Sequence, residues 1–141
     1  DVAPGDTDVA LDLPNPVALS APQQGAPVTP STPYSWSVAG QSAQTFLWHL
    51  EFSETYEGML VITSRTQIEL PTFPDGFTVP PGTGFVWSVE THGDAPDVDA
   101  LAGPDGFLTP FSVGEAFPVG PARGDGYYTE SARRSASMSS D

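Results

Sequence analysis

This chain of 141 residues lacks cysteine and lysine, and its four arginines face eighteen acidic residues, giving a formal net charge of −14. Without cysteine there is no disulfide framework, no thiolate metal site and no cysteine nucleophile. The negative field repels phosphate backbones and anionic headgroups, so we expect no nucleic-acid or membrane-surface partner; basic protein patches and cations fit better. No apolar run approaches the roughly 18 residues of a membrane span.

Proline and glycine are abundant, with 16 and 14 copies, which argues against long helices and for many turns. The length fits one domain with arms. Several segments alternate apolar and polar residues with period two, as half-buried strands do. The predicted strands are 32–38, 45–52 (a central strand), 59–63, 66–70 and 85–89. The sequence therefore predicts an all-β fold.

The run from Val79 to Val89 (VPPGTGFVWSV) sets a Pro-Gly turn before a strand in which Phe85, Trp87 and Val89 share one face. It resembles the corner and penultimate strand of a fibronectin type III sandwich, where the pattern is Leu-x-Pro-Gly-Thr-x-Tyr-x-x-x-Val. Phe85 stands where the pattern has tyrosine, so we expect the corner to lose one hydrogen bond. The run from Thr66 to Pro71 resembles the Thr-x-Ile-x-Leu-Pro stretch that precedes this corner.

The resemblance implies a single antiparallel, immunoglobulin-like β-sandwich of about seven strands, from an exported bacterial protein, with extended N- and C-terminal arms. It covers about residues 32–119, with a closing strand expected within 107–119. Residues 1–31 are acidic and proline-rich, so we expect an arm or linker, with one edge strand around residues 17–19. Residues 120–141, rich in Gly, Tyr and Ser, are expected to be a tail outside the module.

This tail holds three of the four arginines and two tyrosines, so we expect either a flexible tail or a segment that folds onto a protein partner. The tripeptide at 123–125, Arg-Gly-Asp, is an integrin ligand in a loop of some fibronectin type III modules. Here it lies in the tail, so we interpret it as part of a glycine-rich hinge. The predicted partner-binding residues are Arg123, Tyr127, Tyr128, Arg133 and Arg134.

Three tryptophans, Trp36, Trp48 and Trp87, raise the alternative of a sugar-stacking platform. Each is in phase with other apolar residues of its strand, which predicts core positions, least firmly for Trp87 at a sheet edge. His49 alternates outward between Leu47 and Glu51 and is expected to be a surface residue.

The candidate metal ligands in the sequence are found in its acidic segments. Asp94, Asp97 and Asp99 follow His92 and are calcium candidates, although a solvated acidic loop explains them as well. The aspartates at positions 6, 8 and 12 lack the glycine and glutamate of a helix-loop-helix calcium site. No other cofactor is expected. No Gly-x-Ser-x-Gly elbow is present, and we expect no enzymatic activity.

These features predict a non-catalytic structural or interaction module, located outside the cell, on its surface or in the periplasm. It would dock through its arms to other protein subunits of a larger assembly. Two alternatives remain open. One is a carbohydrate-binding accessory domain that uses an exposed Trp87 with Glu51 or Glu90 as acceptors, and the other is a calcium-stabilised adhesion domain.

Overall fold

The structure is a computed structural model that describes residues 16–39, 45–53, 58–72, 78–92, 97–99 and 128–139. Within these residues the chain forms nine β-strands. Their bounds are β1 Ala18–Ala21, β2 Ala26–Val28, β3 Tyr34–Ser37, β4 Thr45–Phe52, β5 Gly58–Thr63, β6 Gln67–Ile68, β7 Gly84–His92, β8 Tyr128–Glu130 and β9 Arg134–Met138.

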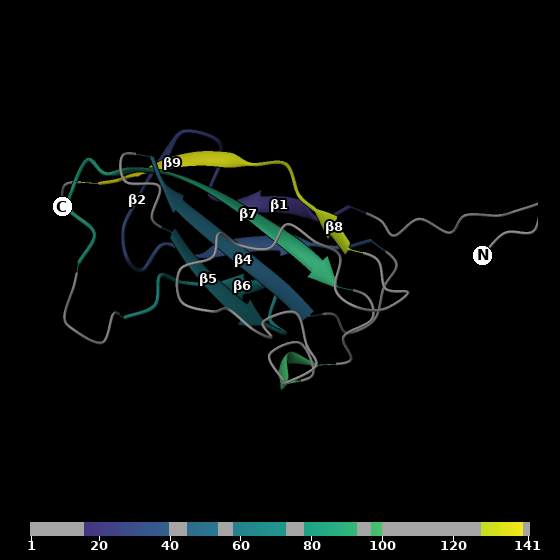
Figure 1. Cartoon of the computed structure of the whole chain (residues 1–141). Helices are drawn as coiled ribbons and strands as arrows, with labels where there is room; N and C mark the ends of the chain where they lie inside the picture. Colours follow the sequence, from purple (N-terminus) through teal and green to yellow (C-terminus); the bar gives the residue numbers. More distant parts are fainter. Residues whose placement is uncertain are drawn as a thin grey trace, which may run out of the picture.

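The strands build two sheets (Figure 1). The smaller sheet has the order β1-β3-β6, and the larger has the order β2-β9-β7-β4-β5, with β8 also paired to β7. All pairings are antiparallel except that of β2 with β9, which is parallel. The long strands β4 and β7 run side by side through the larger sheet, which confirms the central position predicted for residues 45–52.

The hydrophobic core lies between the two sheets. Tyr34 of the smaller sheet makes edge-to-face contacts with Trp48 and Trp87 of the larger one, with ring centroids 5.1 and 5.2 Å apart. Such pairs stabilise a core beyond the area they bury. The predicted inward faces of β3, β4 and β7 are confirmed. Their buried residues are Tyr34, Trp36, Phe46, Trp48, Leu50, Phe85, Trp87 and Val89.

The Pro-Gly corner is a tight turn that leads into β7. Thr83 N–H donates to Pro80 O over 3.2 Å, and Gly82 has a φ of +82°, the positive value that a type II turn requires at its third position. Gly82 N–H also donates to Met138 O (2.8 Å), and Met138 N–H donates to Thr83 O (2.9 Å). The corner is therefore joined to the end of β9 by backbone hydrogen bonds. Phe85, which replaces the expected tyrosine, is fully buried.

The ends of the described chain differ from the expected arm and tail. β1 overlaps the edge strand expected around residues 17–19 and lies at the edge of the smaller sheet, but β2 is a further strand within the segment predicted to be a linker. β8 and β9 fall within the segment predicted to be a tail, and they occupy the position beside β7. The predicted closing strand, 107–119, lies outside the described residues. Ala136 and Met138 of β9 face the core, and this burial explains why so polar a segment forms a strand.

Candidate functional site

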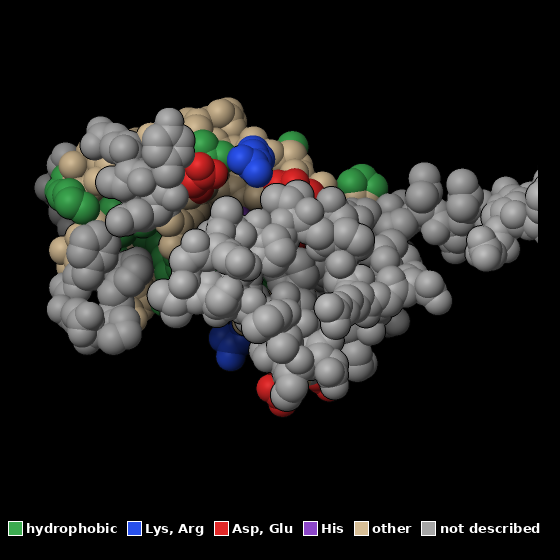
Figure 2. Space-filling view, viewed as in Figure 1, with side chains coloured by type: hydrophobic (Ala, Val, Ile, Leu, Met, Phe, Trp, Pro, Cys, Tyr) green, Lys and Arg blue, Asp and Glu red, His purple; other side chains and the backbone are tan. Residues whose placement is uncertain are grey.

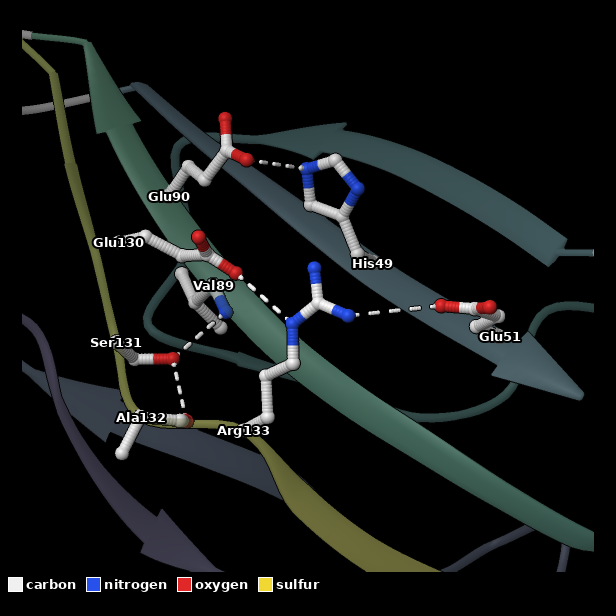
Figure 3. Close-up of polar contacts among 8 residues, drawn as sticks. All are labelled: His49, Glu51, Val89, Glu90, Glu130, Ser131, Ala132 and Arg133. Carbon is white, nitrogen blue, oxygen red and sulfur yellow. Dashed lines mark hydrogen bonds and ion pairs between the residues drawn. The ribbon is translucent and has the colours of Figure 1, made fainter. Parts of the chain in front are cut away.

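Alternate residues of β4 and β7 point away from the core and form the outer face of the larger sheet. Five ionisable side chains gather on this face, and we call them the outer-face cluster (Figure 3). Its members are His49, Glu51, Glu90, Glu130 and Arg133. Figure 2 shows basic and acidic side chains next to one another on the same side of the molecule.

Arg133 lies at the centre of this cluster. Its guanidinium is 3.4 Å from Glu130 through Nε and 3.7 Å from Glu51 through Nη1, so it bridges carboxylates from two different strands. The three side chains are well exposed, at 64% for Arg133, 50% for Glu51 and 35% for Glu130. Ion pairs this exposed contribute little stability, so their charges remain accessible to a partner.

His49 and Glu90 form the second contact of the cluster, with His49 Nε2 3.3 Å from Glu90 Oε1. Glu90 is directly opposite Glu130 in the β7–β8 ladder. Like charges in opposed positions of a sheet repel each other. The ion pair of Arg133 with Glu130 offsets part of this repulsion.

A β-bulge between β8 and β9 positions Arg133. Glu130 pairs with Glu90 and Arg134 pairs with Trp87, so residues 131–133 oppose only two residues of β7. Ser131 fills the gap in the ladder: its Oγ accepts the Val89 N–H (3.0 Å) and donates to Ala132 O (3.0 Å). The extra residue reverses the alternation of faces, which directs Arg133 outward and Arg134 toward the smaller sheet.

Arg134 is occupied by contacts within the fold. Its guanidinium donates to the carbonyl oxygens of Leu19 (2.6 Å), Pro22 (2.8 Å) and Ser20 (3.3 Å), all at or just after β1. It thereby links β9 of the larger sheet to the edge of the smaller one. Arg134 is one of the predicted partner-binding residues, and in this structure its donors face carbonyl groups of its own chain.

Gln24 reinforces this junction from the N-terminal side. Its Oε1 accepts the Ser135 N–H (2.9 Å) and its Nε2 donates to Ser135 Oγ (2.7 Å). Gly25 N–H donates to Ser135 O (2.8 Å). The segment between β1 and β2 is thus bonded along the start of β9.

The other predicted partner-binding residues are distributed differently. Arg133 belongs to the outer-face cluster, whereas Arg123 and Tyr127 lie outside the described residues. Tyr128 begins β8, where its backbone pairs with His92. Only Arg133 is therefore placed by the structure on a charged, exposed surface.

The calcium candidates and the tryptophans have separate outcomes. Asp97 and Asp99 are exposed, and Asp94 lies outside the described residues. Among the described residues, no group of three His, Asp or Glu side chains is arranged to hold a metal ion.

The three tryptophans are at most 3% exposed, so the core positions predicted for them are confirmed, and Trp87 offers no exposed ring for a sugar.

Sequence reasoning overlooked the roles of Gln24, Glu130 and Ser131. Their contacts join residues more than 40 positions apart, with the exceptions of the Glu130–Arg133 pair and the bond from Ser131 to Ala132. The available local signal was the Arg133-Arg134 pair ahead of an alternating Ser-Ala-Ser-Met run. Two adjacent arginines on opposite faces of a strand are a pattern that a bulge or an edge can accommodate.

Comparison of the chain with protein-family models, with curated proteins and with solved structures gives no match. In the described part of the chain, no helix has the length and apolar character needed to cross a membrane.

Proposed function

We propose that this chain is a non-catalytic interaction module of the fibronectin type III-like or immunoglobulin-like kind. If β1 and β2 count as halves of one strand, and β8 and β9 as halves of another, the described sheets contain seven strands. The first, second and fifth then form one sheet, and the fourth, third, sixth and seventh form the other. Two packed antiparallel sheets of seven strands are the arrangement of such modules, which supports this proposal.

The outer-face cluster is the surface that we propose docks a protein partner. The observation that carries this proposal is its charge balance: the cluster holds three carboxylates, those of Glu51, Glu90 and Glu130, and the single guanidinium of Arg133, which contacts Glu51 and Glu130. The whole chain carries a net charge of −14, so the field around this face favours a positively charged partner. The partner would be a protein subunit with a basic patch, met in an extracellular, cell-surface or periplasmic assembly.

This proposal replaces docking through the arms with docking through a sheet face. Residues 18–28 and 134–138 are bonded to each other, and Arg134 and Gln24 use their polar groups in that junction. Rigid strands, by contrast, present Glu51 and Glu130 to solvent. A rigid, preorganised surface loses less conformational entropy on binding than a free segment does.

A comparison of surface variants tests the proposal. The double variant Glu51→Gln/Glu130→Gln removes two charges from the cluster, while Glu69→Gln removes one from an exposed position after β6. Each protein is immobilised and exposed to an extract of the source organism, and captured proteins are identified by mass spectrometry. We expect a set of basic proteins to be retained by the wild type and by Glu69→Gln, and lost by the double variant. Equal capture by all three proteins would contradict the outer face as the docking surface.

A further inference from the structure

The edge strand β5 is the one edge of the described sheets that nothing blunts. It spans six residues, Gly58–Thr63 (GMLVIT), with no charge and no proline. Within the described part of the chain its ladder neighbour is β4, on one side only. An apolar edge of this length is a template for pairing with another strand, which natural proteins normally suppress.

The other edges of the described sheets are protected, and that of β8 is only three residues long. β6 has only two residues, and β2 has three, one of which is Pro27. The outer edge of β1 is covered, because the carbonyls of Leu19 and Ser20 accept hydrogen bonds from Arg134. Edges are commonly protected by short strands, by proline and by charged side chains that cover them. Among the residues that the structure describes, β5 has none of these devices.

We propose that β5 pairs antiparallel with β5 of a second copy of this chain, so that the larger sheets of two molecules join edge to edge. The proposal does not depend on the protein partner proposed for the outer-face cluster, although Glu51 has a part in both surfaces.

Self-pairing fits the residues of β5 well. Leu60 and Ile62 lie on the outer face, opposite His49 and Leu47 of β4, while Met59 and Val61 lie on the core face, opposite Leu50 and Trp48. In an antiparallel pair, opposed residues share a face. A two-fold axis can therefore pass between the two strands, midway between the two copies of Val61. Each Leu60 is then opposite Ile62 of the other copy, and Val61 is opposite its own equivalent. Every one of these cross-strand pairs is apolar, which favours the pairing.

Charge complementarity supports a second copy as the occupant. Glu51 lies beside Gly58 at the start of β5, and Arg65 follows two residues beyond its end at Thr63. Antiparallel pairing brings the start of each strand to the end of the other. Glu51 of one copy therefore lies at the same end of the joined sheet as Arg65 of the other. Because of the two-fold symmetry, this pair of opposite charges occurs twice in the dimer.

The dimer is expected to be weak and sensitive to salt. A six-residue edge buries less area than a standard protein interface, so we expect a Kd between about 1 μM and about 1 mM. Two copies that each carry −14 repel each other at low ionic strength. Raising the salt from about 0.01 M to about 0.15 M shortens the screening length from about 30 Å to about 8 Å, so association should strengthen over this range.

Sedimentation velocity over a concentration series to about 1 mM, in about 0.15 M salt, tests the proposal. We expect the wild type to dimerise, Leu60→Lys to be monomeric and Gln67→Lys, which adds the same charge at the exposed edge strand β6, to dimerise like the wild type. A monomeric wild type overturns the proposal. So does a dimer that Leu60→Lys leaves intact, because it must use another surface.

Cysteine cross-linking provides a second test that does not depend on the folding of Leu60→Lys. The chain has no cysteine, so one introduced thiol reports one contact. Under mild oxidation Val61→Cys should form a disulfide-linked dimer that keeps the secondary structure of the wild type, whereas Gln67→Cys should stay largely unlinked. Equal cross-linking of the two variants, or none in Val61→Cys, would contradict the pairing.

Discussion

The guanidinium of Arg134 donates a hydrogen bond of 2.8 Å to the carbonyl oxygen of Pro22, a residue 112 positions earlier in the chain. Gln24 and Ser135 make a second junction over 111 positions. Segments near the two ends of the described chain are therefore structural parts of the fold. The two surfaces that we propose for recognition are the outer-face cluster and the edge of β5.

Replacing Arg134 with alanine should weaken the fold markedly. The change leaves three carbonyl oxygens, those of Leu19, Ser20 and Pro22, without the charged donor that they share. Since hydrogen bonds to charged groups contribute about 1.5–3 kcal/mol each, we expect a loss of at least about 2 kcal/mol in the free energy of unfolding. Urea denaturation measures this loss.

The adjacent Arg133→Ala is the matched control. It removes the same side chain from an exposed position, where ion pairs contribute little, so the change should stay within about 0.5 kcal/mol. Equal losses for the two variants would contradict the structural role assigned to Arg134.

Ser131→Ala should destabilise the β-bulge. The Val89 N–H loses the Oγ that accepts it over 3.0 Å, in a buried place where water cannot replace it. An unsatisfied buried donor costs about 1–3 kcal/mol. Ser37→Ala, at an exposed position of β3, should be nearly neutral in the same denaturation experiment. A neutral Ser131→Ala would show that the bulge does not need this side chain.

Gly82→Ala should cost about 1–2 kcal/mol, because a side chain at φ +82° is held in the left-handed region. Among the described residues, no atom lies within 4 Å of the position that an added Cβ would take, so the cost comes from the backbone alone. Gly84→Ala provides the comparison: its added Cβ would meet Ser53 Oγ at an ordinary 3.5 Å. Thermal unfolding should show a clear loss for the first variant and little change for the second; the reverse order would contradict the turn geometry.

Tyr34→Phe should leave the protein at least as stable at neutral pH. The buried Tyr34 hydroxyl has no hydrogen-bond partner within the described part of the chain, so removing it relieves a desolvation penalty, and we expect a gain of about 1 kcal/mol. A loss of stability at neutral pH would show that the hydroxyl is satisfied in solution.

The same variant should change the response to alkaline pH. Burial raises the pKa of the Tyr34 phenol well above its ordinary value of 10.0. When a group has a higher pKa in the folded than in the unfolded state, the free energy of unfolding is constant below the unfolded pKa. It then falls as the pH rises toward the folded pKa. The wild type should therefore lose stability relative to Tyr34→Phe above about pH 10, as unfolding at several pH values can measure. Parallel curves would contradict the burial of an unpaired phenol.

The sequence predicted the central strands because their large apolar residues alternate over whole strands. Trp48 and Leu50 in β4, and Phe85 and Trp87 in β7, leave no other interpretation of the period. β9 carries no such signal. Its inward residues include a small alanine and an arginine, and its other positions are serines, so its strand character comes from its place beside β7. That place depends on contacts between distant residues, which local patterns do not encode.

The candidate site was predictable only in part. The alternation in β4 and β7 places His49, Glu51 and Glu90 on one face. Which arginine joins them depends on a single extra residue after Glu130, and the bulge that accommodates it becomes visible only when β8 and β9 are paired with β7.

The parallel pairing of β2 with β9 also sets a condition on synthesis. Ala26–Val28 leave the ribosome more than a hundred residues before their neighbours Ala136–Met138. Until residues 136–138 emerge, β7 lacks β9 as its neighbour, and the core lacks Ala136 and Met138. The larger sheet can therefore close only after translation has passed Met138, and the nascent chain carries exposed tryptophans and an open edge until then.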